Sequence, residues 1–577
     1  MEKINTLYTI VFLCIIAYSL LIKKRAPRKA TGDILLATPW WKRDCPRLAV
    51  ILTVSLSRAV LFTSVPGGVN QDGAMAGVDA LALATHGTDR FGTFMPSHLY
   101  AWGYGQMSAL LSYMESIPIK FFGLNKFTLR FPILLMSLLG IVAIYFLVRL
   151  LWGHDAAMIT GLMTAFNPWH FMQSRWALDC NLFPHFFIIG FLMVCIFITK
   201  KSRIYLYFSM LFFGLCMYCY GVSFYFMPLF LLSTCIYLIV RKRVSIPDVL
   251  VCVAVYFGVS WPEYMVMFIN FMKWDTIELP FVTIQYFKDS VRVNDILFFA
   301  DDIPMQLKQN IKYVIRLLLV QVKDLPWNDI KGFGTVYKCS LPFEIVGLYA
   351  TVKGAFSKKA EVSDEQRCGY YLVFSYWVLG ILLGLMINGI NVNRINIVFY
   401  AQIILIGLGI NYLSKEIRAL AVPVVSMYAV LFVMFLSTYF TDFKEEISGC
   451  FFEDFTKALE CAESYNCERY IITPDTQYDG AYGPTEIEID FAFELDALYI
   501  QGKTNECGGY NVPYNERFYI ANRSPEDMPN TEVCYVFRIR PEDDIDETKD
   551  FRADDYELHI YNNYGVAIPR KYVESLN

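Results

Sequence analysis

Long apolar stretches recur along this chain up to about residue 440, and they restrict its fold more than any other feature. A helix needs about 20 predominantly apolar residues to cross the hydrocarbon core of a bilayer. The composition agrees, because 55% of the 577 residues are hydrophobic and only 18% are charged. We therefore expect an α-helical polytopic membrane protein. About twelve spanning helices are predicted, at residues 4–22, 47–65, 129–152, 156–172, 182–199, 203–220, 222–240, 247–262, 341–355, 369–389, 395–413 and 418–440.

The sign of the charge divides the chain at about residue 440. Residues 441–577 carry 30 acidic and 12 basic side chains, whereas the preceding part carries 24 acidic and 38 basic ones. Because hydropathy falls where the charge changes sign, we place a domain boundary there. Residues 1–440 are expected to form a membrane domain with large external loops at about 66–128 and 263–340. Residues 441–577 are expected to form an acidic, soluble, extracytoplasmic α/β domain.

Basic clusters indicate the orientation of the membrane domain, since short loops rich in Lys and Arg stay in the cytoplasm. If twelve spans alternate, the clusters at 23–29, 200–203, 241–243, 358–359 and 415–418 all fall on one side. Both termini, the two large loops and the loop at 388–396 then lie outside. We interpret the first apolar stretch as a retained helix, because it lacks a small-residue cleavage site and positive charge follows it.

The fifteen cysteines have no paired metal-binding spacing, and most lie in apolar stretches where a thiol behaves as a small hydrophobic group. An external tail would meet an oxidising environment, so one or two disulfides are expected there without a defined connectivity. The tail cysteines are Cys450, Cys461, Cys467, Cys507 and Cys534.

An aspartate, Asp72, follows the second apolar stretch and opens the first large loop. The small residues of D-G-A-M-A-G-V-D-A favour a closely packed helix, on which Asp79 lies two turns after Asp72 on the same face. Asp72 has two interpretations. It is either a solvated loop charge or a general base, which accepts the proton of an attacking hydroxyl when a sugar is transferred to an alcohol.

Four segments of the sequence carry a resemblance: N-Q-D-G-A-M-A-G-V-D-A, H-L-Y-A-W-G-Y-G-Q-M-S-A-L-L-S-Y, F-G-L-N-K-F-T-L-R-F-P and N-P-W-H-F-M-Q-S-R-W-A-L-D-C-N-L-F-P. Together they resemble the membrane glycosyltransferases of family 39, a group that includes protein O-mannosyltransferases, their bacterial relatives and the aminoarabinose transferases that modify lipid A. The resemblance covers about residues 45–240, and the remainder agrees in hydropathy and topology. The combination is specific, although no single segment would suffice.

This resemblance implies a GT-C fold, in which the first large external loop of a transmembrane bundle carries the catalytic aspartate. Such enzymes pass a sugar from a polyprenyl-phosphate carrier to an external acceptor, with inversion and without a nucleotide donor. Asp72 matches the catalytic position. The family usually has a second carboxylate directly after it, where this chain has Gly73. The missing second carboxylate argues against roles that need paired acids, including metal binding. It does not affect a role of Asp72 as a single general base. We expect that no cofactor is required, and the sequence leaves open whether a divalent cation binds.

A phosphate-bearing donor needs cations near the external surface, and the planar fork of arginine matches phosphate oxygens. Arg130, in F-T-L-R-F-P, begins the third span and matches an arginine common in the family. It is a candidate for the donor phosphate or, equally, a snorkelling anchor. Arg175 follows the fourth span beside Trp169, His170 and Trp176. Positive charge on the outer side runs against the usual bias, which favours a functional interpretation of Arg175.

The loop I-N-G-I-N-V-N-R-I-N surrounds Arg394 with four asparagines, whose amides offer donors and acceptors to a phosphate or a sugar hydroxyl. We predict that Asn393, Arg394 and Asn396 contribute to the donor site. The alternative is a structural loop that satisfies its own backbone.

Among the histidines, His86 and His98 lie in the first large loop, and His98 is a further candidate for binding sugar or phosphate. His170 and His185 are expected to be hydrogen-bonded residues at helix ends. No histidine has the spacing of a known metal motif.

The sequence favours an inverting glycosyltransferase for hexosyl or pentosyl groups. No phosphate-binding loop and no dinucleotide fingerprint occur, so nucleotide chemistry and nucleic-acid partners are not expected. A transporter or flippase is the leading alternative, since twelve spans suit that class, but its two halves would be related and its charges would lie at the midplane. The third hypothesis is an inactive relative that acts as a binding module. Gly73, in place of the second carboxylate, is the observation that supports this hypothesis.

The expected partners are a polyprenyl-phosphate sugar, the membrane lipids and an acceptor, which is a protein, a wall polymer or a glycolipid. We expect a multi-pass protein of a bacterial plasma membrane, because the local resemblance is to bacterial members. A lumenal active site in the endoplasmic reticulum would give the same pattern.

Overall fold

A computed structural model describes residues 1–21, 40–101, 105–288, 296–357, 362–415, 420–474, 482–501, 517–520, 529–539 and 547–576. Two compact units form within the chain, and each is described by itself. The first unit is Met1–Val60, Ile133–Tyr264 and Arg292–Tyr439. The second unit is Leu61–Pro132, Met265–Val291 and Phe440–Asn577, so it combines the acidic C-terminal part with segments of both large loops. The basic clusters at 23–29 and 358–359 lie outside the described residues.

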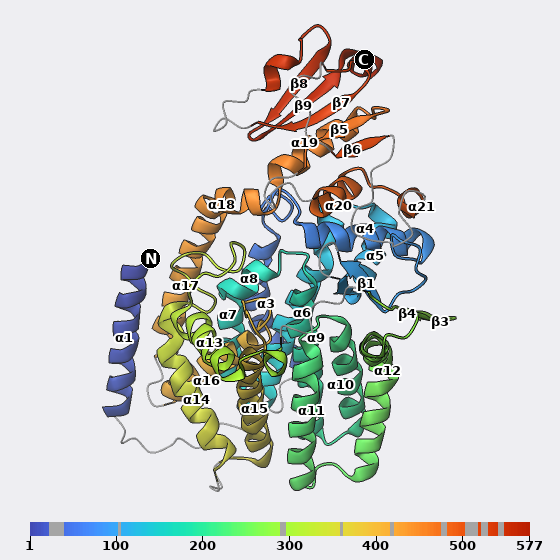
Figure 1. Cartoon of the computed structure of the whole chain (residues 1–577). Helices are drawn as coiled ribbons and strands as arrows, with labels where there is room; N and C mark the ends of the chain where they lie inside the picture. Colours follow the sequence, from blue (N-terminus) through green and yellow to red (C-terminus); the bar gives the residue numbers. More distant parts are fainter. Residues whose placement is uncertain are drawn as a thin grey trace. The chain divides into compact units, whose positions relative to one another are not determined.

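The first unit is helical (Figure 1). Its α-helices are α1 (Glu2–Leu21), α3 (Trp40–Ser55), most of α6 (Lys126–Trp152), α7 (His154–Ala165), α8 (Pro168–Gln173), α9 (Leu182–Lys200), α10 (Arg203–Leu215), α11 (Ser223–Val240), most of α12 (Ile246–Met272), α13 (Ile303–Ile315), α14 (Leu341–Ala355), α15 (Asp364–Met386), α16 (Val398–Ser414) and α17 (Ala421–Phe440). Short 3-10 segments include η1 (Leu56–Ala59), η2 (Asp179–Asn181), η3 (Cys216–Tyr218), η5 (Leu297–Phe299) and η7 (Lys338–Ser340), and Arg316–Val320 is a π-helical turn.

All twelve predicted spans overlap helices of the structure. Over the described residues, six helices are long and apolar enough to cross a membrane: α6, the η2–α9 segment, α11, α12, α15 and α17. This confirms an integral membrane protein. The other predicted spans coincide with α1, α3, α7, α10, α14 and α16. Two of these positions, Arg203–Tyr218 and Val398–Ser414, are apolar helices of shorter length.

Two predicted spans are wrong in their extent. The stretch 47–65 is helical only as far as Ser55, and η1 follows it. The stretch 156–172 is broken after Ala165, because Asn167 caps a new helix and accepts the backbone N–H of His170 at 2.9 Å. Pro168 suits the first turn of α8, where a missing N–H costs nothing. Hydropathy cannot reveal these breaks, because apolar residues continue on both sides of each break.

The C-terminal part of the second unit is an α/β domain, as expected. It contains α18 (Asp442–Cys450), α19 (Glu453–Ser464), α20 (Tyr482–Ala492), α21 (Ala497–Gln501) and α22 (Arg570–Leu576). Its sheet has the order β6-β5-β7-β9-β8, in which β5 is parallel to β6 and β7 while the other pairs are antiparallel. The strands are β5 (Tyr470–Ile472), β6 (Phe518–Ile520), β7 (Cys534–Arg538), β8 (Tyr556–Tyr561) and β9 (Tyr564–Pro569).

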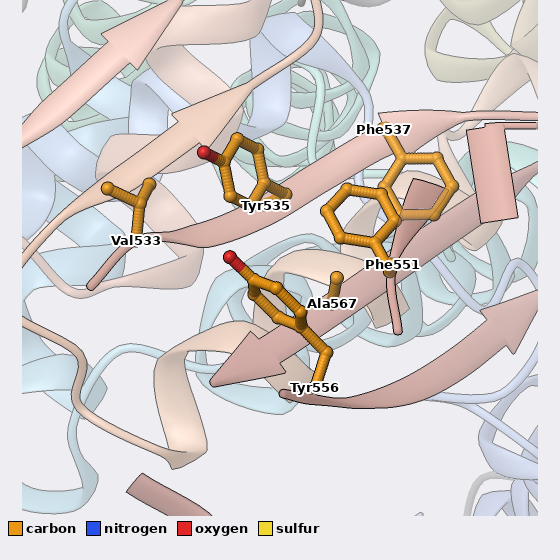
Figure 2. Packing of buried hydrophobic residues seen from close by; sticks show 6 residues of the cluster. All are labelled: Val533, Tyr535, Phe537, Phe551, Tyr556 and Ala567. Atoms are coloured by element: carbon orange, nitrogen blue, oxygen red, sulfur yellow. The ribbon is translucent and has the colours of Figure 1, made fainter. Parts of the chain in front are cut away.

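Aromatic residues form one core of this sheet (Figure 2). The rings of Phe537 and Phe551 stack with their centroids 5.0 Å apart, and Tyr556 meets Phe551 edge-on at 5.2 Å. Helix α19 packs on the sheet through Phe455, whose ring lies 5.0 Å from that of Tyr564. The described tail cysteines Cys450, Cys461, Cys467 and Cys534 form none of the predicted disulfides with one another; Cys507 lies outside the described residues.

The rest of the second unit comes from the two large loops. It contains α4 (Gln71–His86), α5 (Leu110–Phe122) and the first residues of α6. It also contains two antiparallel strand pairs. One is β1 (His98–Ala101) with β2 (Gly105–Ser108), and the other is β3 (Ile277–Leu279) with β4 (Val282–Ile284). Backbone bonds between Ser97 and Thr283 and between Thr283 and Met95 connect these two loop segments.

Candidate functional site

Asp72 lies in the first turn of α4, and the start of this helix is determined by a local cap. Asn70 is the N-cap, and its side chain accepts the backbone N–H of Gly73 at 2.9 Å. Gln71 and Gly73 on either side are buried, whereas Asp72 is half-buried. The positive end of the helix dipole favours a charged carboxylate at this place. The arrangement therefore holds a half-buried carboxylate in the first turn of a capped helix.

Asp79, on the same face two turns later, has a different environment. Its carboxylate forms an ion pair with the guanidinium of Arg90 and accepts the backbone N–H of Arg90 at 3.0 Å. Burial raises the pKa of Asp79 to about 7, although the charge of Arg90 opposes the shift. Arg90 also donates to the carbonyl of Tyr100 at 2.9 Å. Asp79 therefore stabilises the loop after α4 through its contacts with Arg90.

Arg130 contacts the backbone that leads to Asp72. Its guanidinium donates to the carbonyls of Phe62 and Pro66, at 3.1 and 2.9 Å, and to that of Gly68. The side chain is 1% exposed. These bonds place Arg130 and Asp72 in one local structure, and the predicted contact with a donor phosphate stays a prediction.

His98 begins β1 and belongs to the same unit as Asp72. The side chain is buried, and its ring meets that of Phe287 edge-on with centroids 6.5 Å apart. Phe287 also contacts Tyr100, at 4.9 Å. The histidine is thus part of an aromatic cluster that joins the two loop segments.

Arg175 belongs to the first unit, just after α8, and is fully buried. Its Nε donates to the hydroxyl of Tyr439 at 3.1 Å, and its Nη1 donates to the carbonyl of Arg58. The guanidinium also lies over the rings of Phe171 and Tyr439, at 5.6 and 5.4 Å from their centroids. Arg175 therefore joins α8, η1 and the end of α17.

The asparagine-rich loop before α16 is connected to the segment that carries Arg175. Gln173 donates to the side chain of Asn393 at 3.4 Å, and Asn396 donates to the carbonyl of Cys180 at 2.6 Å. Arg394 is half-buried and donates to the carbonyl of Asn388 at 2.8 Å. The structure thus brings Arg175 and this loop together in the first unit, whereas Asp72, Arg130 and His98 belong to the second.

A buried polar relay in the first unit was not predicted. Nη2 of Arg58 lies 3.1 Å from Nδ1 of His170, and Nε2 of His170 lies 2.9 Å from the hydroxyl of Tyr400. The same hydroxyl lies 2.9 Å from Nδ1 of His185. Because a guanidinium only donates, His170 accepts through Nδ1 and donates through Nε2, and Tyr400 donates to His185. The expectation that both histidines are hydrogen-bonded is confirmed.

The relay connects residues from η1, α8, α9 and α16, and no sequence spacing reveals such contacts. The only signal was the polar character of His170 and His185 inside apolar stretches. For metals, the described residues contain no group of three or more His, Cys, Asp or Glu side chains that could hold an ion.

A family model supports the resemblance seen in the sequence. Residues 108–276 match the model described as dolichyl-phosphate-mannose-protein mannosyltransferase. The expected likeness to membrane glycosyltransferases of the GT-C type is thereby confirmed. Comparison with curated proteins gave no match.

Two solved structures have a partly similar fold. One is ArnT from Cupriavidus metallidurans bound to undecaprenyl phosphate, with 12% identity, a TM-score of 0.48 and coverage of 92% of this chain and 98% of that chain. The other is the oligosaccharyltransferase of Archaeoglobus fulgidus tethered with an acceptor peptide, with 13% identity, a TM-score of 0.46 and coverage of 79% of this chain. This chain spans 64% of the archaeal enzyme's length.

Proposed function

We propose that this membrane protein is a glycosyltransferase that moves a sugar from a polyprenyl-phosphate donor to an acceptor hydroxyl on the external face, with Asp72 as the general base. The observation that carries the proposal is the half-buried carboxylate in the first turn of α4, flanked by buried neighbours on a capped helix. A base must reach the proton it accepts and be held in place while it does so. Asp79 does not fit this role, because Arg90 engages its carboxylate.

The proposed reaction is a single displacement. The acceptor oxygen attacks the anomeric carbon on the face opposite the phosphate, and Asp72 accepts the hydroxyl proton. The bond between the anomeric carbon and the phosphate oxygen breaks, and the polyprenyl phosphate leaves with the electron pair. The configuration at the anomeric carbon inverts. One base suffices for this chemistry, so Gly73 after Asp72 is compatible with it.

For the donor phosphate, we propose a direct contact with Arg394 and Asn393. Asn396 is fully buried and donates to the carbonyl of Cys180, so its proposed contribution is to hold this loop. Arg394 is a half-buried cation among amides, and such a group can meet phosphate oxygens through charge-assisted bonds. Arg130 and Arg175 are fully buried and donate to backbone carbonyls. Their proposed contribution to donor binding is to hold the segments on which the site is built.

The proposed acceptor carries a free hydroxyl, and the candidates are a protein serine or threonine, a wall polymer and a glycolipid. The external location is inferred from the basic clusters, which the positive-inside rule assigns to the cytoplasm. A bacterial plasma membrane is the proposed location. Acceptor peptides, wall fragments and lipid extracts, supplied separately with one active donor, distinguish the acceptor classes.

The test is transfer of labelled sugar from a panel of polyprenyl-phosphate sugars by the purified protein with membrane extract. Asp72→Asn is compared with the wild type and with Asp275→Asn, which changes an exposed aspartate of the same unit. We expect turnover to fall by about 100-fold or more in Asp72→Asn only. Wild-type turnover in Asp72→Asn would remove this residue from the mechanism, and no turnover with any donor would exclude the proposed donor class.

A further inference from the structure

The acidic C-terminal part contacts the segment that leads to Asp72, and both belong to the second unit. The backbone N–H of Gly67 donates to Oε2 of Glu453 at 3.3 Å. Glu453 is the first residue of α19 and is 7% exposed. Only Val69, Asn70 and Gln71 separate Gly68 from Asp72, so this contact lies directly before the proposed base.

The two segments approach so closely that no side chain fits between them. A Cβ atom on Gly67 would lie 2.2 Å from Cδ of Glu453, and one on Gly68 would lie 1.9 Å from the carbonyl oxygen of Phe451. Glycine is required at Gly68, where the obstacle is backbone, whereas a side chain at Gly67 would displace the carboxylate of Glu453. The backbone before Asp72 therefore rests on the backbone at the start of α19.

A second set of bonds holds the same glycine from its carbonyl side. Nζ of Lys126 donates to the carbonyl of Gly67 at 3.0 Å and forms an ion pair with Glu460 of α19 at 2.9 Å. Glu453 is itself paired with Lys457 one turn later, at 2.6 Å. Helix α19 thus reaches both polar groups of Gly67, directly through Glu453 and indirectly through Lys126.

The remainder of α4 also packs against C-terminal residues. A Cβ atom on Gly77 would lie 2.8 Å from the side chain of Leu129 and 3.4 Å from the ring of Phe491 in α20. At the end of the helix, His86 is paired with Asp496 at 2.9 Å. Contacts from the C-terminal part therefore run along α4 from the segment before it to its last residue.

We propose that Glu453 is a positioning residue for Asp72, and that the C-terminal domain sets the geometry of the base through α19. The proposal rests on the assignment of Asp72 as the base. Glu453 touches neither reacting group. It fixes the backbone at Gly67, and the capped start of α4 transmits that position to the carboxylate.

The first test compares Glu453→Ala, Glu453→Gln and Lys457→Met in the full-length protein. Loss of the acceptor in Glu453→Ala frees the Gly67 segment, so kcat is expected to fall by about 10- to 100-fold while the KM for the donor changes little, because a small misplacement of a catalytic group is costly. Glu453→Gln keeps an oxygen for the Gly67 N–H and should recover most of kcat. Lys457→Met removes only the ion pair on α19 and should behave as the wild type.

Amide hydrogen exchange provides a readout that does not depend on turnover. We expect faster exchange in residues 66–76 of Glu453→Ala, and protection as in the wild type in Lys457→Met. Unchanged exchange and unchanged kcat in Glu453→Ala would overturn the proposal, as would equal loss of kcat in Glu453→Ala and Lys457→Met. If Asp72→Asn retains turnover while exchange rises in Glu453→Ala, the base assignment fails and the structural contact stands.

A double-mutant cycle tests the contact between Gly67 and Glu453 by a second route. Gly67→Ala places a methyl group where the Glu453 carboxylate lies, so it should lower kcat in the wild-type background. Glu453→Ala removes the clash, and the two losses should therefore not add. Additive losses in kcat would show that the two residues act independently and would overturn the proposal.

Discussion

The hydroxyl of Tyr400 is hydrogen-bonded to two buried histidines, and these hydrogen bonds determine the tautomer of both rings. Arg58 holds His170 with its proton on Nε2, and Tyr400 then donates to Nδ1 of His185. Gly140 lies against the hydroxyl, since a Cβ atom there would be 2.2 Å from it. No larger residue would leave room for the bond.

Tyr400→Phe is expected to destabilise the first unit. The substitution leaves the Nε2–H of His170 and Nδ1 of His185 without their partner, and each unsatisfied buried group costs about 1–3 kcal/mol. Thermal unfolding in detergent should therefore begin at a lower temperature. Tyr412→Phe is the matched control on the same helix, because that hydroxyl has a long contact of 3.4 Å with an exposed lysine. Equal unfolding temperatures for the two variants would contradict the expectation.

At the scale of elements, the sequence predicts which stretches are helical more accurately than where they break. Apolar runs of span length identified α6, α9, α11, α12, α15 and α17, because burial in lipid or protein selects the same residues. The breaks after Ser55 and Ala165 were missed, since they depend on a local cap and on contacts between distant segments. Asn167 followed by Pro168 was the available signal for the second break.

Close packing of α14 on α16 depends on two glycines. A Cβ atom on Gly347 would lie 1.8 Å from the carbonyl oxygen of Leu405, and one on Gly409 would lie 2.1 Å from that of Phe343. Both obstacles are backbone atoms, so the helices themselves must separate to accept a methyl group. Small residues at such a crossing are how membrane helices reach short distances.

Gly347→Ala is therefore expected to lower the free energy of unfolding by about 1–3 kcal/mol, as overpacking does in other cores. The measurement is unfolding of the purified protein in detergent and denaturant. Gly258→Ala in α12 is the matched control, because a Cβ atom there has no heavy atom within 4 Å apart from its own helix and chain neighbours. A loss of equal size in both variants would point to a general effect of alanine in these helices.

At the scale of the whole molecule, the sequence led to Asp72 and its helix but not to the residues that hold them. The small residues of α4 predicted close packing, which Gly77 confirms against Leu129. The bond from Gly67 to Glu453 joins residues that are 386 positions apart, and neither local pattern nor charge count contains such a pair. The change in charge at about residue 440 likewise does not reveal that the second unit includes Leu61–Pro132 and Met265–Val291.

Buried acids make the stability of the second unit sensitive to pH. Burial raises the pKa of Glu486 in α20 to about 9, and the neighbouring Asp490 adds to the shift while Arg90 opposes it. Between its ordinary pKa near 4.5 and about 9, Glu486 is protonated in the folded unit and ionised in the unfolded chain. The unfolded state then binds fewer protons, so stability falls as pH rises through this range, by up to about 1.4 kcal/mol per pH unit.

Glu486→Gln should remove this contribution without changing the shape of the side chain. The variant is expected to gain stability over the wild type as pH rises from 5 to 8, because the amide has no proton to lose in the unfolded chain. Hydrogen exchange of α4 and α20 at each pH measures the second unit separately from the helices of the first. Glu445→Gln, at an exposed acid of α18, is the control and should follow the wild type. A constant difference between Glu486→Gln and the wild type across this pH range would mean that Glu486 is ionised in the folded unit.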